Sequence, residues 1–260
     1  GMTASGIFNV TFGSIPSGTS VIFTLTITAD GGYSVVRTFT ISIGMPSTIA
    51  VAIFDHAATG DISYWTGANM NDYLAYQNIL TSDPSCRFTV SIVTDLLQTT
   101  LSGHDVLILP DNAVPDIYLA DVDAWFTSGK TIVAVDSATC YAAYSGYMWP
   151  TCSGSNCYGS TWDYSSGFND QRIVTTNFVT QCYTLGQVIG SISGDSQMFQ
   201  ASIPADAVSL TDRSADATKI YAAYRDVPGK GRIVVLGPYA AGPSVDTYPL
   251  IRDAVASQFA

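Results

Sequence analysis

Apolar and polar residues alternate along the first part of the chain, and many of the apolar ones are β-branched. This period-two pattern predicts three consecutive strands, at Ile7 to Phe12, Val21 to Ala29 and Tyr33 to Ile43. Asp30-Gly31-Gly32 joins the second strand to the third, because glycine supplies the positive φ of a tight hairpin. Three strands with one apolar face are marginal alone. We therefore expect this segment to pack on the rest of the chain or to be the tail of a β-sandwich.

The pattern changes after Met45-Pro46-Ser47, from consecutive strands to strands that alternate with helices. Apolar runs predict strands at Thr48 to Phe54, Thr89 to Val93, Asp105 to Leu109, Thr131 to Val135 and Arg232 to Leu236, with shorter ones near Val208 and at Ile220 to Arg225. Helical spacing predicts helices at Trp65 to Leu80, Ile117 to Thr127, Tyr183 to Ser191 and Tyr248 to Phe259. Apolar strands separated by helices imply a parallel sheet that is covered on both faces.

The chain therefore divides into a β-rich segment, residues 1–45, and an α/β domain, residues 46–260. Within the second part, residues 141–172 are rich in Tyr, Trp, Gly and Ser, which is typical of an irregular insertion. The insertion follows a strand directly, so we expect it to overhang the ends of the strands.

Charge narrows the possible partners. All 21 acidic residues are Asp, only 10 Lys and Arg oppose them, and the formal net charge is -11. Nucleic acid is excluded as a partner because it requires a basic stripe. No apolar run reaches the roughly 18 to 20 residues of a membrane span. A surface built from Ser, Thr, Gly, Asn, Asp and Tyr is common in extracellular proteins, so we expect an extracellular or cell-surface location.

The five cysteines form an odd set, so at least one is free or pairs with another chain. Cys152 and Cys157 bracket Ser-Gly-Ser-Asn, a spacing that suits a small disulfide in an oxidising compartment. The alternative is two reduced loop thiols. Zinc is disfavoured because the chain has only His56 and His104, and neither lies near this pair in sequence.

Three predicted strands are followed directly by aspartate, at Asp55, Asp111 and Asp136. If the first, third and fourth strands of the α/β domain are neighbours, these carboxylates share the rim at the carboxyl ends of the strands, where ligands of open sheets bind. Such a cluster can hold Ca²⁺ or Mg²⁺, or raise the pKa of one carboxyl for acid/base chemistry. The alternative is that each aspartate caps the turn or helix after its strand.

The run from Asp123 to Ala138 resembles the helix, glycine turn and strand that lead to the nucleophile elbow of class I glutamine-amidotransferase-like proteins. The elbow needs small residues two positions before and after the nucleophile, and Ala134 and Ala138 meet this condition. The resemblance covers roughly residues 48 to 260 and implies a flavodoxin-like three-layer sandwich with a parallel sheet.

Both catalytic positions depart from that family. Asp136 stands where active members have Cys. The stretch from Gly229 to Gly237 looks like the final core strand, but Pro238 and Tyr239 follow where active members place His and then Glu, and this chain has no Glu. The resemblance therefore implies a non-catalytic member without a cofactor.

The N-terminal segment also resembles a known module. Pro16 to Ser20, the alternating stretch from Phe23, Gly31-Gly32-Tyr33 and Ile43-Gly44 are similar to the last strands of immunoglobulin-like modules in bacterial surface proteins and secreted peptidases. This resemblance implies that the α/β domain works within a larger secreted or surface protein.

Aromatic residues of the insertion, among them Tyr144, Trp149 and Trp162, suit the binding of sugars or peptides. They equally suit packing of the insertion onto the domain. The sequence thus favours a non-catalytic module that binds a glycan, a peptide or a neighbouring domain at the rim. One alternative is a hydrolase that uses Asp136 or Cys140 with His56, and another is a module that only spaces other domains.

Overall fold

The structure, a computed structural model, describes residues 20–29, 32–42, 48–55, 72–85, 87–110, 114–149, 162–237 and 245–259. Its contacts divide the chain into two units, Gly1–Ser47 with Phe259–Ala260, and Thr48–Gln258. Each unit is described by itself. The strand expected at Ile7 to Phe12 lies outside the described residues.

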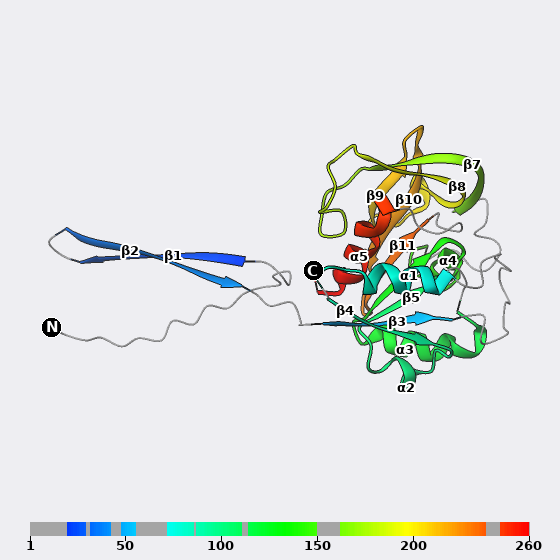
Figure 1. The fold of residues 1–260 in the computed structure, drawn as a ribbon, viewed down its shortest axis with the longest axis horizontal. Helices are drawn as coiled ribbons and strands as arrows, with labels where there is room; N and C mark the ends of the chain where they lie inside the picture. The colour runs from blue at the N-terminus through cyan, green and yellow to red at the C-terminus, as the bar shows by residue number, and fades with distance from the viewer. Residues whose placement is uncertain are drawn as a thin grey trace. The chain divides into compact units, whose positions relative to one another are not determined.

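The smaller unit contains a β-hairpin of β1 (Ser20–Ala29) and β2 (Tyr33–Ser42), drawn in blue in Figure 1. The strands are antiparallel, with Val21 opposite Ile41 and Phe23 opposite Phe39. Gly32 has φ 82°, the left-handed conformation that a tight connection requires. Two of the three strands expected here are therefore present at the expected positions.

The larger unit is built on one mixed sheet of nine described strands in the order β4-β3-β5-β6-β11-β10-β8-β7-β9. Its first half is parallel and consists of β3 (Ile49–Phe54), β4 (Phe88–Val93), β5 (Val106–Leu109), β6 (Thr131–Val135) and β11 (Arg232–Leu236). β5 and β6 are buried throughout because helices cover both of their faces. The α/β class expected from the sequence is confirmed, and β6 and β11 have the expected bounds.

The second half of the sheet is antiparallel. It consists of β7 (Trp162–Ile173), β8 (Val188–Phe199), β9 (Val208–Arg213) and β10 (Asp216–Asp226). β9 pairs with β7 on one side and with β10 on the other, so these four strands form a closed ring. The sheet is therefore mixed and not wholly parallel.

Two expectations for this region were wrong. The helix expected at Tyr183 to Ser191 is replaced by a turn and the start of β8, and Gly186 has φ 82°, which no α-helix contains. The insertion at residues 141–172 is also more regular than expected, because it contains the end of α4 and most of β7. Serine, glycine and aspartate dilute the apolar alternation of β7 and β8, so the strand signal is weak there.

Five α-helices are described: α1 (Asp72–Thr81), α2 (Gln98–Leu101), α3 (Leu119–Thr127), α4 (Thr139–Tyr144) and α5 (Tyr248–Ala256). Val122, Trp125 and Phe126 of α3 join the core cluster that lines one face of the parallel strands. α1 packs against α5, and Figure 1 shows α1 on the opposite side of β3 from α3. No helix among the described residues has the length and apolar character needed to cross a membrane.

Candidate functional site

The rim begins where the parallel strands end. β3, β5 and β6 are neighbours, so Asp55 and Asp136 lie at the same edge of the sheet. Asp55 is half-buried, and its backbone N–H donates to the carbonyl of Val93 at 2.8 Å. Asp111 and His56 lie outside the described residues. Within the described part of the chain, no three His, Cys, Asp or Glu side chains gather into a potential metal site, and calcium binding stays a prediction.

Asp136 sits in a strained turn between β6 and α4. Its φ of 48° is the one positive value of a non-glycine residue in the described chain. A 3₁₀ turn, Asp136–Ala138, follows, and the Thr139 hydroxyl donates to the Asp136 carbonyl at 2.7 Å. Ala134 and Ala138 on either side are fully buried, so larger side chains have no room. This is the geometry of a nucleophile elbow, with aspartate at its tip.

The Asp136 side chain has little access to solvent. Asp136 is 1% exposed, and β8 contacts the elbow turn. A group this buried offers a substrate no direct approach in this conformation. Cys140 lies in α4, one turn after the elbow, but its side chain is outside the described part of the structure.

The described aromatic rings of the insertion lie in the core. Trp149 is 1% exposed, and its indole N–H donates to the Ser202 hydroxyl at 3.2 Å. Tyr141 and Tyr147 are buried beside it in the core cluster and meet edge to face, with ring centroids 5.7 Å apart. The Trp149 side chain therefore packs in the core and is not part of an exposed aromatic surface for binding sugars or peptides.

Two other expected binding residues are placed only by their backbone. Tyr144 is the last residue of α4, and Trp162 is the first residue of β7, opposite Met198 of β8. Met198 in turn lies opposite Ile220 of β10.

A polar cluster that the sequence did not reveal lies between α3 and the turn before β11. Lys230 donates to the Asp123 carboxylate at 2.5 Å, and the Tyr147 hydroxyl donates to the same oxygen. Burial opposes ionisation of Asp123, but these two hydrogen bonds and the lysine charge hold its pKa below the usual value. Burial and the bond to Asp123 raise the pKa of Tyr147. A shallow pocket of about 330 Å³ adjoins the cluster, lined also by Leu119, Ala120, Tyr141 and Ser145.

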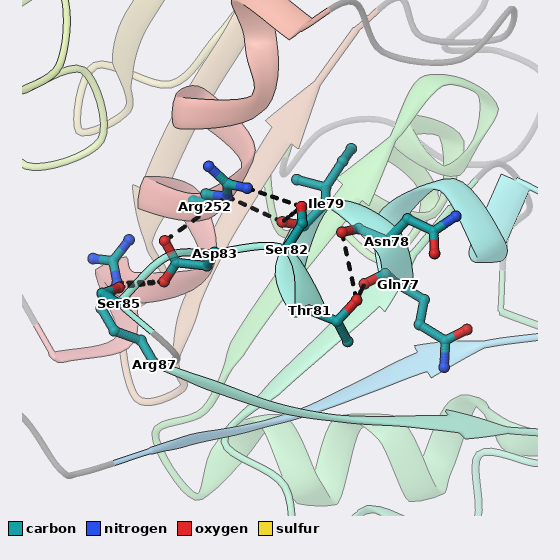
Figure 2. A network of polar contacts seen from close by, with 9 residues as sticks. All are labelled: Gln77, Asn78, Ile79, Thr81, Ser82, Asp83, Ser85, Arg87 and Arg252. Carbon is teal, nitrogen blue, oxygen red and sulfur yellow. Dashed lines mark hydrogen bonds and ion pairs between the residues drawn. The ribbon is translucent and has the colours of Figure 1, made fainter.

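A second network, shown in Figure 2, connects the end of α1, the start of β4 and α5. Asp83 accepts hydrogen bonds from Ser85 and, at 3.1 Å, from Arg87, and Arg252 lies 4.0 Å from its other oxygen. Arg252 also donates to the carbonyl of Ile79 at 3.0 Å. Burial opposes ionisation of Asp83, yet the bonds from Ser85 and Arg87 lower its pKa. This network lies at the amino end of β4, away from the rim, and its role is to hold α5 in place.

Asp253 of α5 is the buried carboxyl next to this network. It is 3% exposed, and its Oδ2 atom has no hydrogen-bond partner among the described residues. Burial raises its pKa, although hydrogen bonds with Gln181 and Cys182 oppose the rise. Burial and Asp253 together raise the pKa of the Cys182 thiol, which makes that thiol a poor nucleophile.

Replacing Asp253 with asparagine is expected to stabilise the protein at neutral pH. The raised pKa means that the folded state favours the neutral acid, so burial of the carboxylate is a cost above that pKa and disappears below the ordinary value of 3.8. The amide of the variant has no charge to bury at any pH. Chemical denaturation should therefore show a gain of about 1 kcal/mol at pH 7 and none near pH 3. Asp246→Asn, at an exposed position, is the control, and a gain of the same size at both pH values would contradict the prediction.

Comparisons with known proteins do not identify a family for this chain. No protein-family model matches this sequence, and no curated protein matches it. Among solved structures, the mmIFT52 N-terminal domain aligns with 11% identity and a TM-score of 0.46, covering 72% of this chain and 85% of that chain. PurLQS from Thermotoga maritima aligns with 11% identity and a TM-score of 0.45, covering 82% and 97%.

A third solved structure is more distant. The exo-beta-1,4-mannosidase Op5Man5 from Opitutaceae bacterium strain TAV5 aligns with 8% identity and a TM-score of 0.37, covering 73% of this chain and 31% of that chain. All three TM-scores are below 0.5, so these likenesses carry no argument about the site. What the structure itself establishes is an α/β domain with a mixed sheet.

Proposed function

We propose that this chain is a non-catalytic, flavodoxin-like member of the class I glutamine-amidotransferase-like superfamily that acts by recognition within a larger secreted or surface protein. The observation that carries the proposal is the elbow at Asp136. Its backbone has the strained left-handed conformation of a nucleophile position, with φ 48°, yet it holds a carboxylate that is 1% exposed.

Chemistry supports the non-catalytic half of the proposal. Amidotransfer needs a thiolate nucleophile and a base to activate it. The elbow has no thiol, and the chain contains no Glu to complete the family's triad. A strained backbone conformation costs about 1–3 kcal/mol. This chain retains that conformation at Asp136, although the nucleophilic cysteine for which the family needs it is absent. The elbow in this chain thus serves to connect β6 to α4.

The rim is where we place the ligand. Ligands of open α/β sheets bind outside the carboxyl ends of the strands, and Asp55 is half-buried at that edge. A glycan, a peptide or an adjacent domain of the same protein is the expected partner, with the carboxylates as hydrogen-bond acceptors. The same oxygens would also serve as ligands of Ca²⁺.

Activity assays test the non-catalytic half. The purified chain and its Asp136→Asn variant are incubated with glutamine and with p-nitrophenyl esters. Asparagine tolerates the left-handed conformation, so the variant keeps the turn. We expect no turnover above the buffer rate for either protein. Turnover that falls at least a hundredfold in Asp136→Asn, with the fold retained by circular dichroism, would establish the hydrolase alternative instead.

Glycan and peptide arrays test the recognition half, with the Asp55→Asn variant as the probe of the rim. The expected result is a ligand class that the native chain retains and the variant binds more weakly. Absence of any ligand on both arrays would favour a module that only spaces other domains.

A further inference from the structure

Positive charge is missing from the segments that follow β3, β4, β5 and β6. The sequence has no Lys or Arg in residues 38–86, 88–129 or 131–171. These stretches contain every segment at the carboxyl ends of β3, β4, β5 and β6. The same segments contain the aspartates Asp55, Asp61, Asp95, Asp111, Asp116, Asp121 and Asp136.

The opposite end of the parallel strands carries three cations that form ion pairs there, whereas Arg213 and Lys219 lie in β9 and β10 of the antiparallel half. Arg87 precedes β4 and pairs with Asp83 at 3.1 Å, while Lys130 precedes β6 and pairs with Asp105 at 3.0 Å. Arg232, the first residue of β11, pairs with Asp226 at 2.6 Å. In the described chain, Asp95, Asp116 and Asp121 form no ion pair with a Lys or Arg.

Two large apolar side chains are exposed among these carboxylates. Ile117 is 72% exposed and Leu97 is 44% exposed. Leu97 immediately precedes α2, and Ile117 lies in the 3₁₀ turn Asp116–Tyr118 that leads into α3. We call Leu97, Asp116, Ile117 and Asp121 the α2–α3 face.

Hydrogen bonds fix the backbone under this face. The Gln98 N–H donates to Asp121 Oδ1 at 3.0 Å, which joins the start of α2 to the first turn of α3. The Tyr118 N–H donates to the carbonyl of Pro115 at 2.9 Å, which closes the turn that presents Ile117. The exposure of both apolar side chains is thus a feature of an ordered surface. Preorganised surfaces bind at a lower entropic cost.

We propose that the α2–α3 face binds a peptide segment that carries Lys or Arg next to apolar side chains. The inference rests on the proposed recognition function and names its partner class. Cationic side chains neutralise the carboxylates that have no counter-charge, and apolar side chains cover Ile117 and Leu97. A neutral glycan does neither, and an anionic partner is repelled. Such an interface derives its association rate from charge and its residence time from apolar contact.

A defined peptide pair tests this binding. The probe is a fluorescein-labelled twelve-residue peptide of alternating Lys and Leu, and its two controls replace Lys with Glu or Leu with Ser. Fluorescence anisotropy with the full chain should show binding of the Lys/Leu peptide at least about tenfold tighter than either control. Raising the salt concentration from about 50 to 300 mM should weaken binding of this peptide, because salt screens the attraction between its lysines and the carboxylates.

Matched variants locate the site. Ile117→Ser is expected to weaken binding about tenfold, whereas Leu185→Ser, at a 66% exposed residue in the turn before β8, changes it less than twofold. Asp116→Asn should weaken binding about two- to threefold and reduce its salt dependence. Asp170→Asn, an exposed aspartate of β7, is the charge control.

Two outcomes overturn the inference. One is binding of the Lys/Leu peptide no tighter than that of its controls, and the other is equal weakening by Ile117→Ser and Leu185→Ser. Its failure is distinguishable from failure of the proposed function. A glycan ligand weakened by Asp55→Asn would preserve recognition and reject the peptide, whereas turnover lost in Asp136→Asn would reject the non-catalytic role itself.

Discussion

Replacing Trp149 with alanine is expected to lower the free energy of unfolding by about 3–5 kcal/mol, the usual cost of truncating a large buried aromatic side chain. Trp149 is 1% exposed within the main core cluster. Its indole also donates to Ser202, which lies in the 3₁₀ turn after β8, so the side chain connects the segment after α4 to the antiparallel half of the sheet.

Urea denaturation followed by circular dichroism measures this loss. Trp149→Phe, which retains most of the buried apolar area, should cost clearly less than the alanine change. Ser202→Ala removes the acceptor of the indole N–H and the hydroxyl's own hydrogen bond to the Phe199 carbonyl at 2.6 Å, and it should cost about 1 kcal/mol. Loss of ligand binding in Trp149→Ala with unchanged stability would mean that the ring belongs to a binding platform.

Gly231→Ala is expected to be about as damaging, for a reason of backbone geometry. A Cβ at residue 231 would lie 1.7 Å from the carbonyl oxygen of Lys130 and 2.7 Å from its carbonyl carbon. No side-chain movement relieves this clash, because both atoms belong to the backbone. The Lys130 carbonyl accepts a hydrogen bond from the Arg232 N–H at 3.1 Å. Moving the two backbones apart to make room for the Cβ therefore breaks the pairing of β6 with β11. We expect a loss of about 3 kcal/mol or more.

Gly229→Ala is the matched control, two residues away in the same turn. Gly229 has φ 73°, but a Cβ there meets nothing within 4 Å. Only the conformational preference is lost, which costs about 1 kcal/mol. Thermal unfolding of both variants compares the two effects, and equal destabilisation would contradict the close approach of Gly231 to Lys130.

The parallel half of the fold could be predicted because most of its strands are short apolar runs that polar or glycine residues bound. Thr131–Val135 and Arg232–Leu236 show this most clearly. β7 and β8 could not be predicted as well, since small polar residues interrupt their pattern and their register is irregular between Ser165 and Phe168.

The elbow was also predictable, because the sequence requirement for small residues at Ala134 and Ala138 is local. Burial of its tip was not, because β8 covers it from far along the chain. The Asp123–Lys230 pair joins residues 107 positions apart, and no local pattern signals such a contact.

The ring formed by β10, β8, β7 and β9 has a consequence for association with other chains. An open sheet exposes two edge strands whose unpaired N–H and C=O groups invite pairing with a foreign strand. Here β9, the last strand in the order, pairs on both sides and offers no such edge, although β8 pairs with β10 and β7 pairs with β9 over only a few residues. β4, by contrast, stands at the other end of the strand order, with β3 as its one neighbour among the described strands. Growth of this sheet into a fibril or a strand-swapped dimer is therefore expected at Phe88–Val93 rather than at β9.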